Sequence, residues 1–216
     1  MWTVKAGDCA RKSARGEEKW SRQRGVYAVS IDWKAWFEKG LPYDEFVAKY
    51  ANDTERQRWQ SVYDRVRLTE EQDALLKSFV REMNVLVLAA TWCGDCVNQC
   101  PIFRRFEEAN DRIKVRFLER DEVPELRDEL KINGGHRIPV VVFLSEDFYE
   151  CARYGERVLS MYRQLAYSRL ETGRPTNIAA SGDELLARAT AEWLDEFERI
   201  HWMLRLSPRL RERHGD

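Results

Sequence analysis

The apolar positions of this chain change their spacing from helical to strand-like several times along the sequence. From Tyr43 to about residue 83 they recur three and four positions apart, which predicts helices with one buried face. Thr69 and Gln72 match a capping box and mark the start of a second helix in this segment. The apolar stripe before that cap consists of Trp59, Val62, Tyr63 and Val66, and the stripe after it of Leu75, Leu76, Phe79, Val80 and Met83.

Strand patterns dominate the middle of the chain. Residues 85–90 are apolar at every position, as expected of a strand covered on both faces. Residues 113–117 alternate apolar and charged side chains, which predicts a half-exposed strand near a sheet edge. Residues 138–144 and 148–154 predict two further strands joined by a polar turn, with the last one antiparallel. A short strand is also predicted at residues 26–31.

Helices are predicted between and after these strands. The first runs from Cys96 to about residue 110, and we expect Pro101 to bend it. Shorter helices are predicted from Pro124 to before residue 133 and around residues 158–166. After a break at residues 172–175, a long final helix begins near Ser181. Strands that alternate with helices indicate an α/β fold.

Composition narrows the classes of partner. The chain has 216 residues, 44% of them hydrophobic, and a net charge of −1, so no overall field attracts nucleic acid or an anionic membrane. The sequence contains no apolar run near the ~20 residues that span a bilayer, and its first thirty residues lack the apolar core of a secretory signal. We therefore expect no nucleic-acid partner, no membrane partner and a cytoplasmic location. The basic residues 1–24 read as a polar, solvated tail.

The most informative motif follows the apolar strand at 85–90. Cys93 and Cys96 are separated by two residues at the predicted junction of this strand with a helix. That spacing lets two sulfurs close a disulfide or open to a dithiol, and the helix start favours a thiolate on the first sulfur. In a chain without a disulfide framework, this pattern indicates redox chemistry.

The order of elements from about residue 70 to 166 resembles the thioredoxin superfamily, and in particular a bacterial branch of thioredoxin-like proteins. The residues that carry this resemblance are Trp92 before the first cysteine, Pro101 in the following helix and the pair Ile138-Pro139. The resemblance implies a central mixed β-sheet flanked by helices, with extra N-terminal and C-terminal helices. It divides the chain into a polar extension (1–42), a thioredoxin-like domain with a helical lead-in (43–170) and a C-terminal helical extension (171–216).

The resemblance also assigns roles to residues. Cys93 would attack and Cys96 would resolve. The Ile138–Pro139 bond would be cis, and the main chain of Arg137 and Ile138, next to Pro139, would bind an extended substrate. The remaining assignments are Trp92 as an apolar wall beside Cys93, and Gly94 and Asp95 as residues that modulate the cysteine pair.

Three departures from the family pattern bear on reactivity. Val87 stands where thioredoxin has a buried carboxylate, and Phe117 is the nearest counterpart of the lysine that pairs with it. Asp95 replaces the usual proline between the cysteines, and its charge disfavours a nearby thiolate. If Asp95 dominates, the pair is a stronger reductant. Arg137 can oppose Asp95, and the sequence does not rank the two effects.

The leading functional prediction is a thiol–disulfide oxidoreductase that reduces protein disulfides with the Cys93–Cys96 pair. It needs no cofactor. Its partners would be a disulfide-containing protein or peptide and a reductant, such as a thioredoxin reductase or a small thiol. A non-catalytic interaction module is the first alternative, because Val87 replaces the family carboxylate and helices are added at both ends.

A metal or iron–sulfur site is the second alternative. Cys93, Cys96, Cys100 and Pro101 resemble part of a ferredoxin run, although the cysteine that precedes such a run is missing. A zinc site would need a fourth ligand such as His136.

Overall fold

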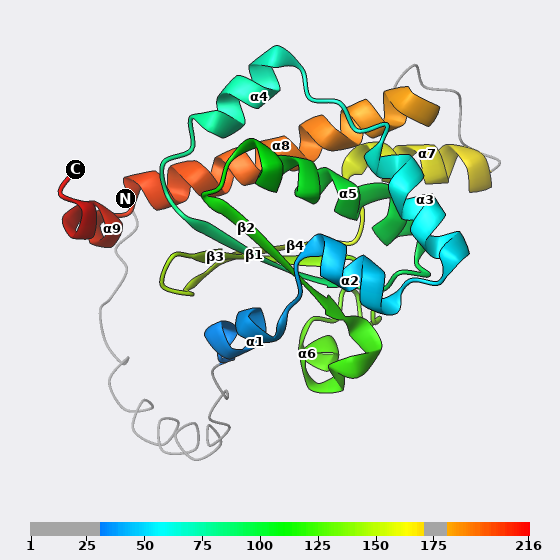
Figure 1. Ribbon diagram of the computed structural model, residues 1–216, viewed down its shortest axis with the longest axis horizontal. Helices are drawn as coiled ribbons and strands as arrows, with labels where there is room; N and C mark the ends of the chain where they lie inside the picture. Colours follow the sequence, from blue (N-terminus) through cyan, green and yellow to red (C-terminus); the bar gives the residue numbers. More distant parts are fainter. Residues whose placement is uncertain (1–30, 171–180) are drawn as a thin grey trace, which may run out of the picture. The chain divides into compact units, whose positions relative to one another are not determined.

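The computed structural model describes residues 31–170 and 181–216, and residues 33–216 form one compact unit. Its centre is a four-stranded sheet in the order β2-β1-β3-β4 (Figure 1). The strands are β1 (Met83–Ala89), β2 (Ile113–Glu119), β3 (Val140–Ser145) and β4 (Glu150–Gly155). β2 is parallel to β1, whereas β3 pairs antiparallel with both β1 and β4. The predicted mixed sheet and its antiparallel last strand are therefore confirmed.

Burial of the strands follows the hydrophobic pattern. Every residue of β1 and β3 is buried, so helices cover both faces of the central strands. β2 alternates between buried and half-buried residues and is the edge of the named sheet, as its sequence predicts. An isolated bridge between Leu41 and Phe117 protects part of this edge.

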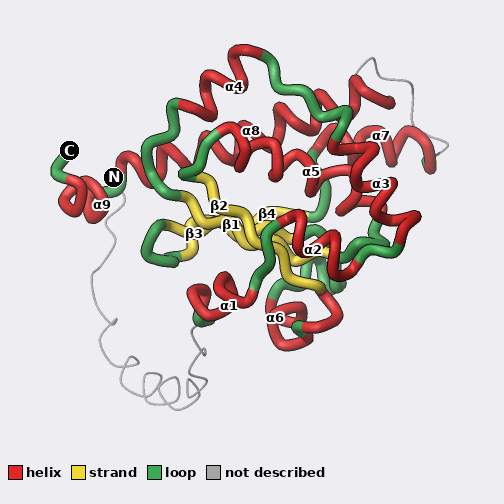
Figure 2. The backbone as a smooth tube through the Cα atoms, viewed as in Figure 1, coloured by secondary structure: helices red, strands yellow, loops and turns green. Residues whose placement is uncertain are grey.

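Two long helices pack on one face of the sheet. They are α5 (Gly94–Ala109) and α8 (Gly182–Leu206), and Figure 2 shows them on the opposite side of the strands from α1 (Trp33–Lys39). The ring of Phe197 in α8 lies edge-on to Phe106 of α5 and to Phe143 of β3. On the other face, Leu86 lies close to Gly40, directly after α1. The predicted final helix thus supplies part of the core.

The helical lead-in consists of α2 (Tyr43–Tyr50), α3 (Asp53–Tyr63) and α4 (Glu70–Lys77). The predicted capping box of Thr69 and Gln72 is present at the start of α4. The expected continuation of that helix through Phe79, Val80 and Met83 is wrong, because α4 ends at Lys77 and Met83 begins β1. Phe79 and Met83 are nevertheless buried, so the apolar spacing reflects burial in two different elements.

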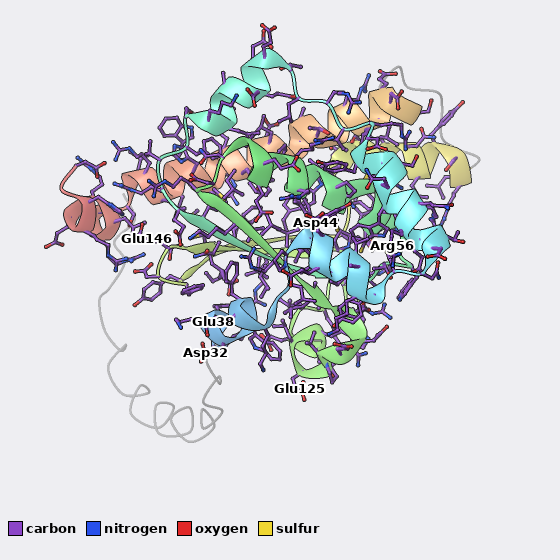
Figure 3. The ribbon with its side chains drawn as sticks, viewed as in Figure 1. Asp32, Glu38, Asp44, Arg56, Glu125 and Glu146 are labelled. Atoms are coloured by element: carbon purple, nitrogen blue, oxygen red, sulfur yellow. The ribbon has the colours of Figure 1, made fainter. Side chains whose placement is uncertain are left out.

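The remaining helices are α6 (Pro124–Glu129), α7 (Leu159–Arg169), α9 (Pro208–His214) and the 3-10 turn η1 (Arg120–Glu122). The side chain of Glu146, labelled in Figure 3, lies in the turn between β3 and β4 and faces α9. Arg213 donates to it at 2.8 Å, and Nε2 of His214 lies 2.8 Å from its other oxygen. The end of the chain is therefore tied to the sheet.

Several predictions concern residues outside the described ranges. The basic tail at 1–24, nearly all of the strand at 26–31 and the break at 172–175 fall there. The division of the chain at 42/43 and 170/171 stays a prediction. Among the described helices, none has both the length and the apolar character needed to cross a membrane.

Candidate active site

The cysteine pair lies at the junction between β1 and α5. β1 ends at Ala89, and Cys93 is the N-cap residue of α5 with extended backbone angles (φ −77°, ψ 121°). Cys96 follows in the first turn of the helix. Both cysteines are buried, Cys96 completely and Cys93 with 9% of its surface exposed. The roles of Cys93 as the attacking sulfur and Cys96 as the resolving one stay predictions.

The segment before Pro139 approaches the first sulfur. The Ile138–Pro139 peptide bond is cis, as predicted. The thiol of Cys93 donates a hydrogen bond to the carbonyl oxygen of Ile138 over 3.8 Å. Ile138 and Pro139 are buried, while Arg137 is exposed. The structure therefore brings the cysteines and the Arg137–Pro139 segment together.

The thiols of the pair influence each other's ionisation. The hydrogen bond with Cys96, followed by burial, raises the pKa of Cys93 above that of an ordinary thiol, although the backbone N–H groups of Cys96 and Asp95 act in the opposite direction. Burial, followed by a hydrogen bond with Cys100, likewise raises the pKa of Cys96 well above its ordinary value. Cys100 is fully buried one turn along α5, so three sulfurs follow one another along this helix.

Asp95 is paired with an arginine that sequence reasoning did not identify. Nε and one terminal nitrogen of Arg157 donate to the two carboxylate oxygens of Asp95 at 2.8 and 2.5 Å. Arg157 lies in the loop between β4 and α7. Arg137, which the sequence suggested as the opposing charge, instead lies 3.7 Å from Glu156. The planar, two-point contact makes Arg157 the direct counterion of Asp95.

A buried polar network extends this contact into the core. Glu156 is buried, and one of its carboxylate oxygens accepts from Arg157 at 2.6 Å and from Tyr162 at 3.0 Å. The amide of Gln99, on α5, donates to the Glu156 carbonyl at 2.8 Å and accepts from the indole of Trp193 at 3.0 Å. The network connects α5, the β4–α7 loop and α8, so the final helix supports the loop that holds Asp95.

The lead-in helices support the other side of the motif. The indole N–H of the fully buried Trp59, on α3, donates to the carbonyl of Thr91 at 2.9 Å. The hydroxyl of Thr91 donates to Glu55 at 2.9 Å. Trp92 itself is 50% exposed, and the guanidinium of Arg120 lies 4.7 Å from its ring centroid. Trp92 is thus half exposed next to Cys93 in the sequence, and its role as an apolar wall stays a prediction.

The positions that depart from the thioredoxin pattern are apolar and buried. Val87 and Phe117 are direct partners on β1 and β2, and neither carries an ionisable group. Two residues further along β2, Glu119 pairs with Ala89. Burial, with the neighbouring charges of Asp121 and Glu122, raises the pKa of Glu119 to about 7. An acid that titrates near neutrality thus lies at the same end of the sheet as the cysteines.

The described residues contain no group of three or more histidine, cysteine, aspartate or glutamate side chains arranged to hold a metal ion. The ring nitrogen of His136, suggested as a fourth ligand, lies 2.6 Å from a carboxylate oxygen of Asp128. The geometry of this part of the chain therefore does not favour the metal alternative.

Known proteins share this architecture. A family model described as thioredoxin matches residues 40–166. No curated protein matches. A solved structure of a protein of unknown function from Pseudomonas aeruginosa is 19% identical, with a TM-score of 0.63 over 79% of this chain and 99% of that one. An HIV epitope-scaffold is also 19% identical, with a TM-score of 0.56 over 76% of this chain and 98% of that one.

At this identity the two structures establish the fold alone. The matched range 40–166 begins before α2 and ends within α7, so it includes the lead-in helices as well as the strand and helix that carry the cysteine pair. Because that match spans more than half of the sequence, the chain belongs to the thioredoxin-like superfamily.

Proposed function

We propose that this protein is a thiol–disulfide oxidoreductase that reduces disulfides in proteins or peptides. The observation that carries the proposal is the contact of Cys93 with the Ile138 carbonyl, which precedes the cis Pro139, while Cys96 is buried behind it. This arrangement supports attack by Cys93, resolution by Cys96 and main-chain binding of an extended peptide.

The reaction follows from the order of the two sulfurs. The Cys93 thiolate attacks one sulfur of the substrate disulfide and forms a mixed disulfide, and the substrate thiolate that leaves takes up a proton. Cys96 then loses its proton and attacks the Cys93 sulfur, which releases the second substrate thiol. The substrate gains two electrons and Cys93–Cys96 becomes a disulfide, which an external dithiol or a thioredoxin reductase returns to the dithiol. A reducing cytoplasm fits this cycle.

Turnover of a disulfide substrate with dithiothreitol tests the proposal. The variant Cys93→Ser removes the attacking sulfur and should lower the rate to that of dithiothreitol alone. Cys151→Ser is the matched control, because Cys151 lies on β4 away from the pair and should leave the rate unchanged. Equal rates for wild type and Cys93→Ser would instead favour a non-catalytic module.

A second experiment identifies the partner. The variant Cys96→Ser cannot resolve the mixed disulfide, so a substrate should stay bound to Cys93 and be released by a reductant. Mass spectrometry of the trapped complexes reports both the cysteine used and the substrate. Trapping that occurs with Cys93→Ser and not with Cys96→Ser would contradict the assigned order of the sulfurs.

A further inference from the structure

We propose that Arg157 is a positioning residue that sets the reactivity of the Cys93–Cys96 pair by holding and neutralising the carboxylate of Asp95. This inference rests on the proposed function, because it concerns the same sulfurs. It adds a residue that belongs neither to the cysteine motif nor to the segment before Pro139.

The two-point contact of Arg157 with the Asp95 carboxylate is called the clamp below. Both carboxylate oxygens of Asp95 accept from Arg157, at 2.8 and 2.5 Å. The side chains are 17% exposed for Arg157 and 26% for Asp95, so water and salt screen the pair less than a surface ion pair. The third nitrogen of Arg157 donates to a carboxylate oxygen of the buried Glu156 at 2.6 Å, so the guanidinium is also held on the side away from Asp95. Such a fork holds both position and charge.

The position of Asp95 explains why its charge matters. It is the second residue of α5, between the two cysteines, where its backbone N–H and that of Cys96 favour a thiolate on Cys93. An unpaired carboxylate at this point would oppose those N–H groups, because like charges disfavour ionisation of a neighbour. Arg157 cancels that charge and leaves the N–H groups in place. The clamp therefore favours the thiolate and the reduced pair.

Other charged groups face the site from neighbouring elements. On α3, the guanidinium of Arg58 lies 3.9 Å from the position that a Cβ on Gly94 would take. Arg137 approaches from the segment before Pro139 and pairs with Glu156 at 3.7 Å. Arg120, from η1, lies over the ring of Trp92. In the first turns of α5, the ionisable groups besides Asp95 are the thiols of Cys96 and Cys100. These groups stay unchanged when Arg157 or Asp95 is replaced, so a double-mutant cycle isolates the clamp.

Four variants test the inference. Arg157→Met removes the charge and keeps an unbranched side chain, and Arg157→Lys keeps the charge but not the fork. Asp95→Asn removes the opposing charge, and Asp95→Asn/Arg157→Met removes both. The first readout is the equilibrium of the Cys93–Cys96 disulfide with dithiothreitol. The second is the pH dependence of alkylation at Cys93, read by peptide mass spectrometry.

Arg157→Met should shift the dithiothreitol equilibrium about tenfold toward the disulfide, which corresponds to a potential about 30 mV more negative. The alkylation midpoint of Cys93 should rise by about one pH unit. The double variant should return to within about threefold of wild type, and Arg157→Lys should lie between wild type and Arg157→Met.

Two results would overturn the inference. One is an Arg157→Met equilibrium and alkylation profile equal to wild type. The other is a double variant that keeps the values of Arg157→Met, since the effect would then come from the β4–α7 loop or from the Glu156 carboxylate that Arg157 also contacts, and not from the charge of Asp95. Neither readout requires substrate turnover. A protein that reduces no substrate would thus refute the proposed function while leaving the role of Arg157 testable, and the reverse also holds.

Discussion

The buried amide of Gln99 provides the sharpest test of how α8 is joined to the site. Its Nε2 group donates to the carbonyls of Glu156 at 2.8 Å and Asp95 at 3.2 Å, and its Oε1 accepts from the indole of Trp193 at 3.0 Å. Gln99→Met keeps the length of the side chain and removes every polar atom. We expect this variant to leave the Trp193 N–H and the Glu156 carbonyl buried without a partner.

The magnitude follows from those two groups. A buried polar group left without a partner costs about 1–3 kcal/mol, so the two groups together predict that Gln99→Met lowers the free energy of unfolding by about 2–6 kcal/mol. Trp193→Phe leaves Oε1 of Gln99 unpaired and opens space beside Phe103 and Tyr154, which pack on the Trp193 ring. In the double variant both ends of the Gln99–Trp193 bond are gone. It should therefore be more stable than the sum of the single effects by about 1–2 kcal/mol.

Urea unfolding followed by far-ultraviolet circular dichroism measures all four free energies without relying on tryptophan fluorescence. Gln57→Met on α3 is the matched control, because Gln57 is exposed and the same substitution there should change stability by less than about 0.5 kcal/mol. A coupling energy below about 0.3 kcal/mol between Gln99 and Trp193 would refute the reasoning. So would a Gln99→Met variant as stable as Gln57→Met.

Three further predictions concern the loop before Cys93, the acid at the end of β2 and the C-terminal contact. Trp59→Phe removes the donor to the Thr91 carbonyl and should lower the free energy of unfolding by about 1–3 kcal/mol, measured in urea. Burial raises the pKa of Glu119 to about 7, so the wild-type protein should lose stability as pH rises from about 4.3 through 7. The melting temperature of Glu119→Gln should fall less over this range, and parallel melting profiles for the two proteins would contradict the prediction. The pKa of Glu146 is lowered, because its hydrogen bonds with His214 and Arg213 outweigh the opposing effect of burial. The stability that these bonds confer is present above about pH 4.3 and is lost as pH falls through the lowered pKa. Glu146→Gln should therefore flatten this acid dependence of the melting temperature.

The parts of the fold that could be predicted are those encoded in neighbouring residues. The all-apolar run at 85–90 identified β1, and the alternation at 113–117 identified an edge strand, because burial on two faces or one leaves a local signature. The same rule failed after Lys77, where the stripe of α4 ran into a loop and then β1 without a change in spacing. The helix α1, with only two buried residues, left too weak a pattern to be predicted.

The residues of the candidate site also differ in how far the sequence alone could predict them. Cys93, Cys96 and Pro139 could be predicted because the motif spacing and the family resemblance both point to them. The counterion of Asp95 could not, since Arg157 lies 62 positions away and is one of 36 lysine and arginine residues with no distinguishing pattern. Sequence reasoning chose Arg137 for its nearness to Pro139, whereas the chain path after β4 decides which arginine reaches α5.

Gln99 is the one residue of the network that carried a readable signal. It lies four positions before Phe103 and next to Cys100, on the stretch of α5 that is buried against α8. An amide at such a position must find partners inside the protein, because an unpaired buried amide destabilises the fold. Two of its partners, Glu156 in the β4–α7 loop and Trp193 on α8, lie after the last strand, so a polar residue within an apolar stripe indicates that an additional segment packs there.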